Sequence, residues 1–293
     1  MINILKFSTG SGMATLTRYR TMMAGINLTL NAFATNGTTP TARINNIPVT
    51  LGSTVYMLFG DTGGASINKV LTQGTGNGTW TENTTALPYF SLGGFVTNVN
   101  GTVYIGGGYG GGTNHFSTTN FSTYTSQTSY PISGIRSCCG TPLNNKLYVS
   151  GGYSDVLANW QRASYSYNGS TWSAETTYPF DTDTPAVWTF DGTSKYYWSS
   201  GGAVYSYTGS GAYVAETGTP AGVNGLYNNT TVYNTRVYLG SGTNWYSWNG
   251  SGAWKTELTS TGWNTFGGTI MGNNLYAKPY TTSTTVYKAS IGA

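Results

Sequence analysis

The sequence predicts an all-β chain, and the first two observations behind this are its composition and its lack of helical patterning. Of the 293 residues, 42 are Gly, and Thr, Ser and Asn are abundant. Gly tolerates positive φ angles, while Asn and Ser stabilise turns through their own side chains, so many short strands joined by tight turns are expected. Thr, Tyr, Val and Trp favour pleated strands. No apolar pattern of helical period persists along the chain.

The third observation is a repeat in which a hydrophobic residue is followed by Tyr, usually just after a turn. Periods of roughly 40–50 residues in a strand-rich sequence are typical of propeller blades, each a sheet of four strands. The sequence therefore predicts a single β-propeller of six blades. The pair occurs six times, at intervals of 38 to 49 residues, as Val55-Tyr56, Val103-Tyr104, Leu147-Tyr148, Tyr196-Tyr197, Val237-Tyr238 and Leu275-Tyr276.

Two further landmarks accompany this pair. A small or glycine-rich stretch follows it, as in Gly151-Gly152, and an aromatic strand then leads through a turn to another aromatic residue, as from Asn168-Gly169 to Trp172. Asn-Gly between alternating strands is a strong hairpin signal. Taken together, the landmarks resemble the kelch repeat over roughly residues 43–290. The resemblance implies a kelch-like propeller.

The two ends of the chain are expected to meet. The chain ends soon after Lys288, which leaves the sixth repeat without its last strand, whereas residues 27–33 read as a strand followed by a turn-rich segment to Pro40. We expect the N-terminal strand to pair with the C-terminal one, because ring closure removes exposed sheet edges. The expected organisation is a propeller over residues 26–293, preceded by an arm over residues 1–25.

Charge and hydropathy exclude several classes of protein. The 13 Lys and Arg residues are scattered, and the net charge is only +4, so the chain lacks the basic stripe of a nucleic-acid-binding protein. No run of about 18 apolar residues is present, so no membrane span is expected. No ordinary signal peptide is recognised in the first 30 residues. Cys138 and Cys139 are adjacent, and such neighbours rarely form a disulfide with each other.

Chemistry-bearing residues are few. His115 is the single histidine, so a multi-histidine metal site is excluded, and no metal or cofactor is expected. His115 is interpreted either as a ligand-binding or basic group or as a solvated loop residue. Asp181 and Asp183 form the only close acidic pair, which suits a calcium site, a glycosidase or, as we favour, a turn. An enzyme is therefore not the expected function.

Aromatic residues near the glycine positions are the better functional candidates. Kelch-like blades place their longer loops there, and aromatic faces stack on sugars and suit protein interfaces. The alternative for each of them is packing within or between blades. The candidate ligand-binding residues are Tyr109, His115, Tyr153, Trp160 and Trp245.

The composition favours a protein displayed outside a cell, since charges are few and Thr, Asn, Gly and Tyr are many. A non-enzymatic virion structural or surface protein, such as a phage fibre, tail-tip or decoration component, would combine this composition with the lack of a recognised secretion signal. It would be displayed on the virion surface or released by lysis, with its arm docked on other virion or assembly subunits, and it could bind a receptor. The alternatives are a lectin-like propeller that binds cell-surface glycans, whose repeated weak sites would raise avidity, and a glycosidase-type enzyme.

Overall fold

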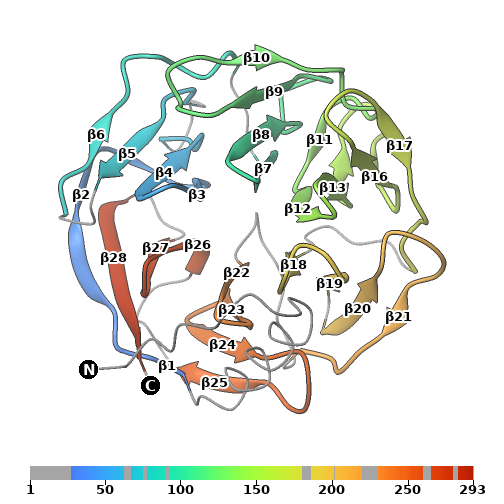
Figure 1. Cartoon of the computed structure of the whole chain (residues 1–293). Coiled ribbons are helices and arrows are strands. Elements are labelled where there is room, and N and C mark those ends of the chain that lie inside the picture. The colour runs from blue at the N-terminus through green and yellow to red at the C-terminus, as the bar shows by residue number, and fades with distance from the viewer. Residues whose placement is uncertain are drawn as a thin grey trace, which may run out of the picture.

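The computed structural model describes residues 28–62, 67–74, 78–89, 93–179, 186–200, 202–219, 230–259, 265–279 and 283–292. These residues form an all-β fold without a helix among them. Their strands build seven antiparallel sheets, of which five have four strands, one has five and one has three. The six larger sheets surround a common centre in a propeller-like arrangement (Figure 1). The expectation of an all-β chain made of many small sheets is confirmed.

The five four-stranded sheets follow one another along the chain. The first contains β3 (Ile47–Leu51), β4 (Thr54–Leu58), β5 (Leu71–Gly74) and β6 (Thr81–Glu82). The second contains β7 (Phe95–Val99), β8 (Thr102–Gly106), β9 (His115–Thr118) and β10 (Thr125–Ser126). The third contains β12 (Cys139–Leu143), β13 (Lys146–Ser150), β16 (Ser164–Tyr167) and β17 (Trp172–Ala174). The fourth contains β18 (Ala186–Thr189), β19 (Tyr196–Ser200), β20 (Ala203–Tyr207) and β21 (Val214–Ala215). The fifth contains β22 (Thr230–Tyr233), β23 (Arg236–Ser241), β24 (Asn244–Trp248) and β25 (Lys255–Leu258).

The other two sheets depart from this plan. The five-stranded sheet combines the last strands with the first ones: β26 (Thr265–Met271), β27 (Asn274–Pro279), β28 (Ser283–Gly292), β1 (Thr29–Leu30) and β2 (Ala34–Arg43). The three-stranded sheet is inserted around the third large sheet and contains β11 (Ile135–Arg136), β14 (Tyr153–Ser154) and β15 (Asn159–Trp160).

One strand of each large sheet lies nearest the centre (Figure 1). These inner strands are β3, β7, β12, β18, β22 and β26, and each contacts the next in that order. The last of them, β26, contacts β3, so the contacts between inner strands run around the whole centre.

The repeated hydrophobic-Tyr pair lies on the second strand of every large sheet, namely β4, β8, β13, β19, β23 and β27. Its side chains pack between neighbouring sheets. Tyr148, for example, belongs to one buried cluster with Tyr196, Trp198 and Tyr207, which joins the third sheet to the fourth. Because each small sheet buries its faces against its neighbours through large aromatic side chains, a chain poor in aliphatic residues can still form a core.

The N-terminal strands complete the last sheet. In β1, Thr29 lies opposite Gly292 of β28, which confirms the expected pairing of residues near 27–33 with the C-terminal strand. The segment expected to be turn-rich as far as Pro40 is instead the ten-residue strand β2, which also pairs with β28. Its register shifts between Thr35 and Thr38 and again before Arg43, and such irregularities accommodate the Gly and Pro that a regular strand disfavours. The arm expected over residues 1–25 lies outside the described residues.

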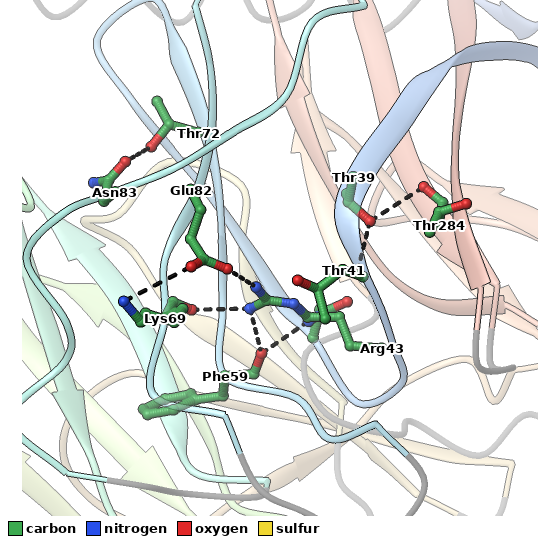
Figure 2. A network of polar contacts seen from close by, with 10 residues as sticks. Thr39, Thr41, Arg43, Phe59, Lys69, Thr72, Glu82, Asn83 and Thr284 are labelled. Atoms are coloured by element: carbon green, nitrogen blue, oxygen red, sulfur yellow. Dashed lines mark hydrogen bonds and ion pairs between the residues drawn. The ribbon is translucent and has the colours of Figure 1, made fainter.

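Arg43, at the end of β2, fastens this sheet to the first one (Figure 2). Its side chain is fully buried and donates from Nη1 to the carbonyl oxygens of Phe59 and Lys69, at 3.3 and 3.0 Å. Its Nη2 atom lies 3.2 Å from Oε2 of Glu82 on β6. Burial lowers the pKa of Arg43 to about 10, and the Glu82 carboxylate opposes that shift. The guanidinium therefore stays charged at neutral pH and links three segments of the first sheet to β2.

Lys278 lies on the other side of the same junction. It is 3% exposed, and its Nζ donates to the carbonyl oxygen of Arg43 at 2.7 Å and to that of Ser283. Burial, and then the nearby charge of Arg43, lower the pKa of Lys278 to about 8. The junction thus buries two cations, and one of them bonds to the backbone of the other residue.

Candidate functional site

The β14–β15 hairpin pairs with β11, the strand that precedes the third large sheet. We use the name hairpin platform for the hairpin (residues 153–161) together with the two segments that support it, residues 107–114 and 133–136. Ile135 and Arg136 of β11 pair with Ser154 and Tyr153 of β14, and Tyr153 in turn lies opposite Trp160 of β15. Backbone hydrogen bonds then tie β11 to the preceding loop, from Gly108 N to Ile135 O and from Gly134 N to Gly112 O.

Two glycines of the repeated landmark make room for this arrangement. Gly152 has a φ of +95°, and a Cβ there would lie 2.5 Å from the carbonyl oxygen of Arg136. Gly107 has a φ of +65°, and a Cβ there would lie 2.9 Å from the side chain of Ile135. Both positions therefore require Gly, because a side chain would be strained in that backbone conformation and would also displace β11. The glycine-rich stretches thus allow the connecting segment to cross close to the sheet ends.

A buried serine fixes the tip of the hairpin. Ser154 is fully buried, its hydroxyl donates to the carbonyl oxygen of Ser133 at 3.1 Å, and it accepts from the backbone N–H of Leu157 at 3.1 Å. Ala158 has a positive φ of 53°, which closes the turn. The backbone of the tip is therefore anchored by a buried side chain, whereas Val156 and Leu157 are exposed.

The platform presents an unusual group of exposed apolar side chains. Large hydrophobic side chains are normally scattered singly on a soluble protein, and a group of them marks an interaction site. Among the described residues, five large hydrophobic side chains are exposed, and four of them belong to the platform: Tyr109 at 55%, Val156 at 67%, Leu157 at 59% and Trp160 at 39%.

Polar groups are arranged around the platform aromatics. The rings of Tyr153 and Trp160 meet edge to face with centroids 4.8 Å apart, and Cζ of Arg136 lies 4.9 Å from the centroid of Tyr153. Nε of Arg136 also lies 3.1 Å from Oδ1 of Asp155. Asn159 accepts a hydrogen bond from the side-chain amide of Gln161. The result is an aromatic surface bordered by planar side chains that can both donate and accept.

The structure separates the five candidate residues into two groups. Tyr109, Tyr153 and Trp160 belong to the platform. Trp245 is fully buried in β24, where it packs against Phe33 with ring centroids 5.6 Å apart, so its expected place on a loop is wrong. His115 is only 1% exposed, so its interpretation as a solvated loop residue is also wrong. Both side chains lie in the packed interior because the aromatic strands alternate between faces that are covered by neighbouring sheets.

His115 is the first residue of β9 and lies in a box of aromatic rings, the His115 cluster. Its ring centroid is 4.7 Å from that of Tyr167, 5.0 Å from Trp172, 5.7 Å from Tyr104 and 5.8 Å from Phe95. Its Nδ1 is 3.0 Å from the carbonyl oxygen of Thr128, and a carbonyl can only accept, so Nδ1 carries the proton. Burial lowers the pKa of His115 to about 4. The imidazole is therefore neutral at physiological pH and closes the contact between the second and third sheets.

The centre of the ring contains a second, different surface. A cavity of about 340 Å³ is lined by residues of the six inner strands. The residues described there include no ionisable side chain. Each strand contributes one threonine to the lining: Thr50, Thr97, Thr141, Thr189, Thr231 and Thr269. The cavity thus offers hydroxyl and backbone groups but no acid, base or cation.

Acidic residues in the described part of the chain are mostly engaged in local structure. Glu216 pairs with Lys195 at 2.6 Å, and Glu257 pairs with Lys255 at 3.2 Å. Asp191 accepts from the backbone N–H groups of residues 193 and 194, which is a turn. Asp181 and Asp183 lie outside the described residues. No group of three or more His, Cys, Asp or Glu side chains that could hold a metal ion occurs among the residues described.

Sequence reasoning missed the other members of the platform, which are Arg136, Asp155, Val156 and Leu157. Its one available signal was spacing. The interval between Tyr148 and Tyr197 is the longest of the repeat, and it contains the inserted hairpin. The pairing of β14 with β11 decides which residues of the insertion face outward. Neither segment shows a periodic sequence pattern, so this pairing could not be predicted.

Comparison with known proteins places the fold and leaves the function open. No protein-family model matches the sequence, and no curated protein matches it. Among 702 matching chains of known structure is the one titled "Structure of YjhT". It superposes with a TM-score of 0.65 at 14% sequence identity, over 87% of this chain and 99% of that chain. The likeness is one of fold. At this identity, and with so many similar chains, it carries no activity over, because propellers host many functions.

Among the residues that the structure describes, none belongs to a helix long and apolar enough to cross a membrane.

Proposed function

We propose that this chain is a six-bladed, kelch-like β-propeller that serves as a non-enzymatic surface protein of a virion or similar assembly and recognises its target through the hairpin platform. The observation that carries the proposal is that four of the five exposed large hydrophobic side chains of the described residues, Tyr109, Val156, Leu157 and Trp160, belong to the platform. Exposed patches of this kind, rimmed by polar residues, mark interaction sites.

The rigidity of the platform supports a recognition role. The tip is fixed by Ser154 and the base by the pairing of β11 with β14, so little order has to be gained on binding. A preorganised surface binds more tightly for the same contacts, because less conformational entropy is lost. Trp, Tyr and Arg are also the residue types most often found at the centres of interfaces.

The composition supports display on the outside of a particle. Only 8% of residues are charged, and Thr, Ser, Asn and Tyr supply most of the polar groups of the chain. The arm of residues 1–25 is the proposed attachment to neighbouring subunits. No contact in the described part of the chain favours the glycosidase alternative, and the acidic pair Asp181 and Asp183 lies outside that part.

The proposal is tested in the natural lysate that contains the protein. Antibody detection across a density gradient should find the chain co-sedimenting with high-mass particles. Particles carrying the double variant Tyr109→Ala, Trp160→Ala should still contain the chain but should attach to their target surface at least about tenfold less. A chain that sediments only as a free monomer would overturn the assembly role, and unchanged attachment would overturn the role of the platform.

A further inference from the structure

We infer that the hairpin platform binds a neutral pyranose sugar, which stacks on Trp160 and is hydrogen-bonded by the planar side chains beside it. The inference rests on the proposed function, since it names the ligand class of the same surface. It is carried by the particular arrangement of four side chains: Trp160, Tyr153, Arg136 and Asp155.

Trp160 supplies the stacking surface. Its side chain is 39% exposed although Trp160 lies opposite Tyr153 in the β14–β15 pair. One part of the indole therefore contacts Tyr153, and the rest is open to solvent. The edge-to-face contact with Tyr153, at 4.8 Å and 71°, fixes the plane of the indole. A fixed aromatic plane matches the apolar C–H face of a pyranose, and little side-chain entropy is lost when the sugar stacks on it.

Arg136 supplies hydrogen-bond donors in a fixed position. Its guanidinium lies over the Tyr153 ring, and its Nε faces Asp155 Oδ1 at 3.1 Å, so the group is held from two sides. No residue of the described part of the chain bonds to its two η nitrogens, and the side chain is 44% exposed. Two parallel N–H donors of this fork can bind two adjacent hydroxyl oxygens. Asn159 and Gln161, the sequence neighbours of Trp160, are engaged with each other through a side-chain hydrogen bond.

The charge balance selects a neutral sugar. The one cation of the platform is paired with its one carboxylate, so the surface has no net charge to attract an acidic or an amino sugar. An anionic ligand would compete with Asp155 for Arg136 and would face that carboxylate at close range, which is unfavourable. A neutral sugar needs no counter-ion, and its hydroxyl oxygens can accept from the η nitrogens of Arg136.

A protein partner is the competing interpretation, and it makes a different demand on the platform. Val156 and Leu157, at 67% and 59% exposed, lie in the turn of the hairpin, on the stretch that joins Ser154 to Asn159. A protein interface would need the apolar tip as well as Trp160, because interface energy is concentrated in central apolar anchors. A single sugar ring on Trp160 needs only the hairpin strands and Arg136.

The experiment uses the full chain and titrates it with the methyl glycosides of glucose, galactose, mannose and N-acetylglucosamine, followed by saturation-transfer NMR and Trp fluorescence. At least one should bind with a Kd of roughly millimolar order, which is usual for one sugar ring on an open site. Glucuronate and glucosamine should bind at least about fivefold more weakly. Trp160→Ala should reduce the affinity at least about tenfold, and Arg136→Lys should reduce it about threefold or more, because lysine lacks the planar fork.

Matched controls separate the two interpretations. Val156→Ser with Leu157→Ser should leave sugar binding within about twofold, and so should Val214→Ser, an exposed apolar side chain on β21 away from the platform. Circular dichroism verifies that each variant is folded. Binding that is lost equally with the tip variant, or a preference for the charged sugars, would overturn the inference.

The outcome is also distinguishable from failure of the proposed function. One outcome is that no neutral glycoside binds at about 20 mM while the tip variant still abolishes attachment to the target surface. In that case the platform recognises a protein, and the sugar inference is wrong. If neutral sugars bind through Trp160 but attachment does not change in any platform variant, the proposed function is wrong and the sugar site stands.

Discussion

Two junctions between sheets in this molecule perform the same task with opposite chemistry. The second and third sheets meet through the His115 cluster, where four aromatic rings surround one neutral imidazole. The strand β2 meets the first sheet through Arg43, a buried cation held by two carbonyl oxygens and one carboxylate (Figure 2). Nζ of Lys278 donates to the backbone carbonyl oxygen of Arg43.

This difference shows which of the two junctions depends on single residues for its stability. In the aromatic junction the stabilisation is spread over many contacts, so the loss of one ring leaves the rest in place. In the charged junction each group depends on its partner, because a buried charge without a partner is strongly unfavourable. We therefore expect the charged junction to fail abruptly and the aromatic junction to fail gradually.

The largest effect is expected for Arg43→Met, which keeps the bulk of the side chain but removes its charge. Glu82 and the carbonyl oxygens of Phe59 and Lys69 would lose their donor, so the free energy of unfolding should fall by about 3–5 kcal/mol in urea denaturation. Glu82→Gln is the matched control. Its side chain is one-third exposed and can still accept, so it should lower stability by about 1 kcal/mol or less. A loss below about 1 kcal/mol for Arg43→Met would remove the contrast between the junctions.

The second effect tests the neutral imidazole in the aromatic junction. Because the pKa of His115 is about 4 in the folded chain and near 6.5 when unfolded, the unfolded chain binds the extra proton as pH falls between these values. The stabilisation is complete above pH 6.5 and is lost progressively toward pH 4, by about 3 kcal/mol. Since His115 is the only histidine, His115→Phe should remove this part of the pH dependence. Parallel pH profiles for the two proteins would refute the assignment.

The third effect probes how closely the inner strands of the same two sheets approach. A Cβ at Gly140 would lie 2.3 Å from Oγ1 of Thr97 on the neighbouring inner strand. Gly140→Ala should therefore lower stability by about 2 kcal/mol, as overpacking does. Thr97→Ala removes the atom in the way, so the double variant should recover at least about 1 kcal/mol, measured as the coupling energy of a double-mutant cycle. Strictly additive losses would show that the strands lie farther apart.

The smallest effect concerns Lys278 in the charged junction. Its pKa of about 8 lies below the unfolded value of 10.5, so the unfolded chain holds a proton that the folded chain releases between these values. Stability from this group is therefore lost as pH falls through 8 and gained as pH rises. Between pH 7 and 9 the wild type should gain about 1 kcal/mol relative to Lys278→Met. Comparing the two proteins at each pH cancels the contributions of Tyr and Cys titration, and a constant difference would contradict the prediction.

The sequence predicts the repeating part of the fold well, because each repeat of the sequence corresponds to the same position in a sheet. Each Tyr of the hydrophobic-Tyr pair lies on the second strand of a sheet, where alternation places it between neighbouring sheets. The strand β2 could not be predicted in the same way. Gly37 and Pro40 interrupt it, and its pairing with β28 depends on a partner some 250 residues away in the chain.

The site was only partly predictable for a related reason. Aromatic residues beside glycines in a repeat suggest loops, but Tyr153 and Trp160 belong to the short strands β14 and β15 of the platform. The same argument placed His115 and Trp245 on loops, although both face covered sides of strands. Arg43 and Lys278, which hold the charged junction, carry no sequence signal at all, since one Arg and one Lys look the same whether buried or exposed.

The joining of β1 and β2 to β28 has a consequence for how the protein is made. The sheet that contains residues 29–43 and 283–292 cannot assemble until the ribosome has released the latter, so the early strands must wait, unpaired, through the synthesis of five other sheets. During that interval Lys278 has not yet been synthesised, so the charged junction around Arg43 cannot be completed until the last sheet forms.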